Sequence, residues 1–69
     1  MAYFEENSEA MLALEAMVDK VGVRNVLYAL EHICFAKAEH LEHTWQDHDQ
    51  AKDWRRCARK CQRTAATVV

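Results

Sequence analysis

The sequence predicts an all-α protein built from a few long helices. It contains no proline and one glycine, whereas a sheet protein of this length needs several tight turns rich in glycine, proline and asparagine. Its hydrophobic fraction of 51% and charged fraction of 29% are typical of a folded chain. With 69 residues, the chain is expected to form one domain, 1–69, whose own core is small enough to need a staple or a partner.

The first helix is expected to be short and to span about residues 8–20. Asn7 or Ser8 can cap its N-terminus. Its apolar residues then recur at three-to-four spacing, as on one face of a helix: Met11, Leu14, Met17, Val18 and Val21. Gly22 suits a left-handed helix end, and residues 1–7 are expected to form a loose arm.

Two longer helices are expected over residues 23–46 and 48–65. The apolar stripe of the longer one comprises Val23, Val26, Leu27, Leu30, Ile33, Cys34, Ala38, Leu41 and Trp45. Asp47 and Gln50 have the spacing of a capping box before the last helix. In that helix apolar residues follow a heptad seam: Ala51, Trp54, Ala58, Cys61 and Ala65.

The short link between these two helices predicts an antiparallel hairpin with a defined register. If the turn lies near residues 47–48, facing positions have numbers that sum to about 95. The expected pairs are Trp45 with Ala51, Leu41 with Trp54, Ala38 with Ala58, Cys34 with Cys61, and Leu30 with Ala65. Large side chains then face small ones at most levels, and both tryptophans belong to the core beside the turn.

Self-association is expected because the last helix offers mainly alanine and cysteine to its neighbour. Such a thin hairpin leaves apolar residues of the first two helices partly uncovered. The residues expected to mediate self-association are Leu14, Val26, Leu30 and Ile33. The simplest assembly is a two-fold homodimer that forms a helical bundle.

A histidine-rich helix end provides the first candidate site. Glu39, His40 and His43 lie three or four residues apart on one helix, and such pairs can share a transition metal. His40 flanks the apolar stripe and His43 lies well off it. The favoured interpretation is therefore a solvated helix end without a cofactor, with a transition-metal site as the alternative.

The thiols provide the second candidate. Cys57 and Cys61 lie four residues apart on the last helix, and Cys34 is expected opposite Cys61. The spacing is not the Cys-x-x-Cys of thioredoxin-like proteins. Core filling is favoured because Cys34 and Cys61 fall on seam positions; redox or metal use, and a disulfide between Cys34 and Cys61, are the alternatives.

A basic run on the last helix is the third candidate. Residues 52–63 carry six basic groups and one acidic group, whereas residues 1–19 carry five acidic groups and no basic one. The candidate partner-binding residues are Arg55, Arg56, Arg59, Lys60 and Arg63. Solvated charges, or pairing with the acidic region inside one chain or across a dimer, are favoured. An acidic protein partner and nucleic acid are the alternatives.

Composition limits the location and the ligand class. The formal net charge is −2, so no general attraction to nucleic acid or acidic lipid is expected. No stretch approaches the roughly 18 apolar residues of a membrane span, and the acidic N-terminus lacks a signal-peptide pattern. Three cysteines form a poor disulfide framework and favour free thiols in the cytoplasm.

No catalytic residue is expected. Ser8 is the only serine and is expected to cap a helix, and neither a phosphate-binding glycine loop nor a pocket with paired carboxylates is predicted. The main hypothesis is a small non-catalytic helical interaction protein, an adaptor or regulator that acts as a homo-oligomer. The alternatives are a metal- or redox-responsive helical protein and a weak nucleic-acid binder that uses the basic helix.

Overall fold

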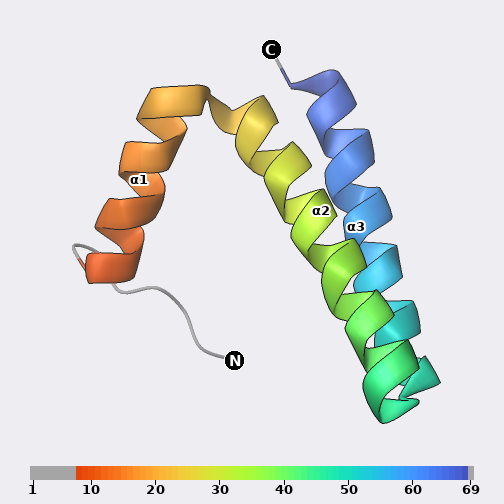
Figure 1. Cartoon of the computed structure of the whole chain (residues 1–69). Helices are drawn as coiled ribbons and strands as arrows, with labels where there is room; N and C mark the ends of the chain where they lie inside the picture. Colours follow the sequence, from red (N-terminus) through yellow and green to blue (C-terminus); the bar gives the residue numbers. More distant parts are fainter. Residues whose placement is uncertain (1–7, 69) are drawn as a thin grey trace.

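The protein is all-α, as the sequence predicts. The structure is a computed structural model that describes residues 8–68. In this range it contains three α-helices, one short π-helical turn and no strand. Helices α2 and α3 form a long antiparallel hairpin, and α1 diverges from it (Figure 1). The expected arm at residues 1–7 lies outside the described residues.

Helix α1 spans Glu9–Val21, close to the predicted range. The Ser8 hydroxyl accepts a hydrogen bond from the Met11 N–H at 3.1 Å, which satisfies one of the free donors at the helix start. The helix ends at Gly22, whose φ of 86° and ψ of 159° lie in a region open almost only to glycine. This residue sets the direction in which α1 leaves α2.

Helix α2 spans Val23–His40 and is followed by a π-helical turn at Leu41–Trp45. The prediction of one regular helix to residue 46 is therefore wrong in its last turn. Gln46 adopts the left-handed conformation, and the Asp47 N–H donates to the Leu41 carbonyl at 3.0 Å. The Gln46 N–H donates to the same carbonyl, so the ending of the helix closes on Leu41.

Helix α3 spans His48–Thr67, and Asp47 caps it as predicted. The Asp47 carboxylate accepts a hydrogen bond from the Gln50 N–H at 3.1 Å. The predicted seam of α3 is confirmed, because each of its residues is buried or half-buried: Ala51, Trp54, Ala58, Cys61 and Ala65. The core of the described chain is correspondingly small and comprises Val26, Cys34, Ala38, Ala51, Ala58 and Ala65.

Two expected core positions are exposed. Leu30 does not face Ala65, because the α2 seam continues from Cys34 through the half-buried Glu31, as the alternating three-and-four spacing of a heptad requires. Trp45 is 69% exposed. In a π-helical turn residue i+5 returns above residue i, so Trp45 lies beside His40, and its Nε1 donates to the His40 Nε2 at 3.3 Å.

The alanine seam predicts a sharp contrast between two alanines of α3. Ala58→Leu should lower the free energy of unfolding by about 1–3 kcal/mol, because Ala58 is fully buried against α2 and a larger side chain must push the helices apart. Ala66→Leu is the matched control, since Ala66 is exposed on the same helix, and it should change stability by less than about 0.5 kcal/mol. Urea unfolding checks both; equal effects would contradict the seam.

Candidate interaction surfaces

One face of α2 becomes more exposed with distance along the helix from Gly22, where α1 and α2 meet. Val26, Leu30 and Ile33 are spaced three and four apart and so share a face. Val26, one turn from Gly22, is only 8% exposed, whereas Leu30 and Ile33 are 41% and 48% exposed. Figure 1 shows the reason: α1 and α2 meet near Gly22 and separate toward the other end of α1.

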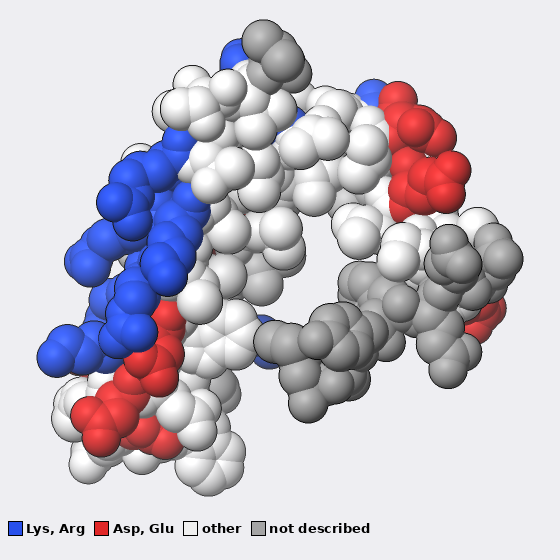
Figure 2. Space-filling model, turned by 180° about the vertical axis from the view of Figure 1, so that it is seen from behind, with Lys and Arg blue, Asp and Glu red and all other residues white. Residues whose placement is uncertain are grey.

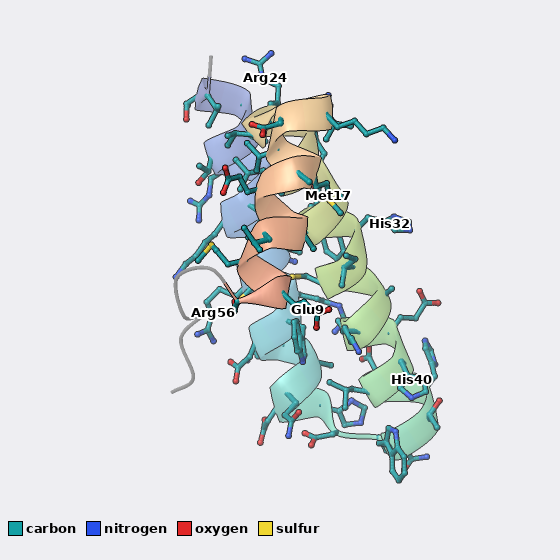
Figure 3. The ribbon with its side chains drawn as sticks, turned by 90° about the vertical axis from the view of Figure 1, so that its left-hand side faces the viewer. Glu9, Met17, Arg24, His32, His40 and Arg56 are labelled. Atoms are coloured by element: carbon teal, nitrogen blue, oxygen red, sulfur yellow. The ribbon has the colours of Figure 1, made fainter. Side chains whose placement is uncertain are left out.

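Helix α1 is itself poorly covered. None of the residues Glu9–Val21 is buried; Met11, Leu14 and Val18 are half-buried, and Leu12 and Met17 are exposed. Within the described residues α1 packs against α2 alone. The side view places α1 in front of the hairpin (Figure 3), and the space-filling view shows open space between them (Figure 2).

The residues predicted for self-association therefore differ in their exposure. Val26 is buried and Leu14 is half-buried inside the single chain, whereas Leu30 and Ile33 present apolar surface. Two open hollows also lie on the hairpin. One, of about 390 Å³, is lined by Ile33, Ala36, Lys37 and His40; the other, of about 310 Å³, is lined by Gln50, Asp53, Trp54 and Cys57.

The basic residues of α3 form a stripe on the molecular surface (Figure 2). Two of them are engaged within the hairpin: Arg55 forms an ion pair with Glu42, and Arg56 with Asp53 at 3.1 Å. The other four basic residues of α3 form no ion pair within residues 8–68: Lys52, Arg59, Lys60 and Arg63. The predicted partner-binding set is therefore divided, with Arg55 half-buried in the hairpin and Arg59, Lys60 and Arg63 open to a partner.

Glu42 joins the two helices of the hairpin, a role that was not predicted from the sequence. It accepts a hydrogen bond from Arg55 across the hairpin, and its Oε1 lies 3.6 Å from the His48 Nδ1. The hydrogen bond from Arg55 holds the pKa of the Glu42 carboxyl below its usual value, and the nearby positive charges act in the same direction. The numbers 42 and 55 sum close to the predicted register, which is the signal that could have identified this pair.

The Glu42 pair predicts a specific acid sensitivity. A carboxyl with a lowered pKa in the folded state stabilises the fold above its unfolded pKa, and this contribution is lost as the pH falls through the folded pKa. The wild-type protein should therefore melt at a higher temperature than Glu42→Gln at about pH 6, and this difference should shrink below about pH 4.5. Circular dichroism melts across this range check it, with Glu39→Gln as the control; a constant difference for Glu42→Gln would contradict it.

The predicted metal ligands are not gathered into one ligand set. Among the described residues no group of three or more histidine, cysteine or acidic side chains could hold a metal ion, so Glu39, His40 and His43 do not converge. His40 instead contacts the turn, where its Nδ1 lies 3.5 Å from the Thr44 Oγ1. A transition-metal site stays an untested prediction of the sequence.

The three thiols lie near one another, although no disulfide joins them. Cys34 is buried, Cys61 is half-buried and Cys57 is exposed. Burial raises the pKa of the Cys34 thiol, and the neighbouring Cys61 and Cys57 raise it further. The predicted placement of Cys34 near Cys61 agrees with this, and redox use of the thiols stays a prediction.

The burial pattern predicts an order of thiol reactivity. The thiolate is the nucleophile, so a buried thiol with a raised pKa reacts slowly. Iodoacetamide at about pH 8 should modify Cys57 before Cys34, by roughly tenfold or more in rate, as followed by mass spectrometry of peptides. Denatured protein serves as the control, in which this difference should disappear. Faster modification of Cys34 in the native state would contradict the packing of the hairpin.

Comparison with known proteins found no matching family model, no matching curated protein and no matching solved structure. None of the helices described within residues 8–68 is both long enough and apolar enough to cross a membrane.

Proposed function

We propose that this protein is a small non-catalytic interaction protein that acts as a homo-oligomer and uses the basic stripe of α3 to bind an acidic protein. The observation that carries the proposal is the pairing of two unlike surfaces on one small hairpin. One is the uncovered apolar surface at Leu30 and Ile33, and the other is a stripe of cations, four of them without an ion pair among residues 8–68.

The exposed area supports self-association. The whole chain exposes 5835 Å², whereas a compact monomer of 8.0 kDa exposes about 4,400 Å². The radius of gyration of 13.8 Å likewise exceeds the roughly 11 Å of a compact domain of this length. A standard interface removes about 800 Å² from each partner, so a second copy can account for a little more than half of the excess area.

The charge pattern supports an acidic protein as the further partner. Long-range attraction of a polyanion is weak for a chain of net charge −2, and the carboxylates of α1, at Glu9, Glu15 and Asp19, oppose it. A local stripe of cations instead complements an acidic surface of similar size and gives the encounter its orientation.

Affinity capture from a native extract tests this role, with Arg59→Gln compared with Lys20→Gln. Each variant removes one exposed positive charge, the first from the stripe of α3 and the second from α1. Quantitative mass spectrometry should show that Arg59→Gln captures acidic partners roughly fivefold less well, as expected for about 1 kcal/mol. Lys20→Gln should capture them normally, and raised salt should weaken capture by the wild type.

Two results would contradict the proposed function. If the capture recovers only the protein itself, the proposal of an acidic partner is wrong. If native mass spectrometry of untagged protein shows a monomer, the proposed homo-oligomer is wrong.

A further inference from the structure

Helix α1 carries apolar side chains beyond the side that faces the hairpin. Met11, Leu14 and Val18 form that side and are half-buried toward the hairpin. Leu12 lies about 100° from Met11 and about 200° from Leu14 around the helix, and it is 52% exposed. A helix whose apolar side chains extend beyond one face gains burial from a second neighbour.

If α1 packed against its own hairpin, only the side with Leu14 would be covered. This packing would cover Leu14 together with Leu30 and Ile33, but it would leave Leu12 on the outer surface. The open wedge between α1 and the hairpin, shown in Figure 2, offers a different solution, because a second helix placed in it contacts α1 and the hairpin at once.

We infer that the wedge is occupied by α1 of a second copy of this chain. Each α1 then lies between the partner's α1 and the partner's hairpin, and the two α1 helices form the centre of a two-fold bundle. The Leu14 sides of the two α1 helices face each other, and the Leu12 side of each α1 faces the partner's hairpin. This inference rests on the proposed self-association and specifies the surfaces that carry it.

Charge complementarity favours a second copy as the occupant. Glu15 lies three residues after Leu12 and Asp19 lies four residues after Glu15, so both lie on the Leu12 flank of α1, with Glu15 between Leu12 and Met11. On the hairpin, Lys37 lines the hollow beside Ile33. Within the described residues none of Glu15, Asp19 and Lys37 forms an ion pair. Burial of either carboxylate against a second hairpin would require a cation nearby, and Lys37 of the second copy supplies one.

Leu12→Glu tests the inference, with Tyr28→Glu as the matched control. Both side chains are exposed in the single chain, by 52% and 43%, so neither change should disturb the fold. Tyr28 lies five residues from Ile33, on the opposite side of α2 from the apolar face. Sedimentation equilibrium should show the dimer of Leu12→Glu weakened about 30-fold or more, as for a hot-spot residue, and the dimer of Tyr28→Glu unchanged.

The outcomes separate this inference from the proposed function. If the wild-type protein is a monomer, the self-association on which both rest is wrong. A wild-type dimer that Leu12→Glu leaves intact would overturn the wedge alone, and loss of the dimer in Tyr28→Glu but not in Leu12→Glu would place the interface on the other side of α2. Circular dichroism of each variant confirms its helix content.

A second measurement uses the wild-type protein and needs no variant to fold. Chains with natural and heavy nitrogen are mixed, treated with an amine-reactive cross-linker and digested. Mixed-isotope links should join Lys20 of one copy to a hairpin lysine of the other: Lys37, Lys52 or Lys60. Inter-chain links confined to hairpin lysines would place α1 outside the interface and overturn the inference.

Discussion

The fold depends on close contact between α2 and α3 through alanine. Ala38, Ala51, Ala58 and Ala65 are fully buried, and such small side chains let two helix axes approach closely. The same choice limits the core, because each alanine removes only one methyl group from water. A hairpin with this seam is well defined in register but hides little apolar surface. The larger apolar residues of α2, such as Leu30 and Ile33, lie outside the seam. The hairpin therefore has an apolar surface on which a further helix can pack.

Most of this arrangement could be predicted because it follows from helical periodicity. The heptad of α3 is explicit in the sequence, and the short link after Trp45 determines which residues of α2 face it. The exposure of Trp45 could not be predicted from spacing, because a π-helical turn is decided by local hydrogen bonds around Leu41 and Gln46. Leu30 was assigned to the seam because it is apolar. The geometry instead selects Glu31, whose aliphatic stem can lie along the seam.

The candidate surfaces could likewise be predicted only in part. The basic character of α3 is a property of composition and was evident from the sequence. Which cations are engaged within the chain depends on the hairpin register and on the geometry of its turn, which together bring Glu42 beside Arg55. The acidic N-terminal region, residues 1–19, was expected to pair with these cations within one chain or across a dimer. Within the described residues no ion pair joins α1 to α3, so this expectation is not met between these two helices of one chain.

Helix α1 connects the small core to the proposed assembly. Its direction is set at one residue, Gly22, where a Cβ would meet no atom within 4 Å but the backbone φ of 86° disfavours any side chain. The angle at this residue separates α1 from the hairpin and leaves both sides of α1 without full cover. Hydrophobic burial is the main favourable term in folding, and α1 gains little of it from its own chain. The element with the fewest internal contacts is therefore the one with the most to gain from a second copy, and the proposed interface uses the surfaces of α1 around Leu14 and around Leu12.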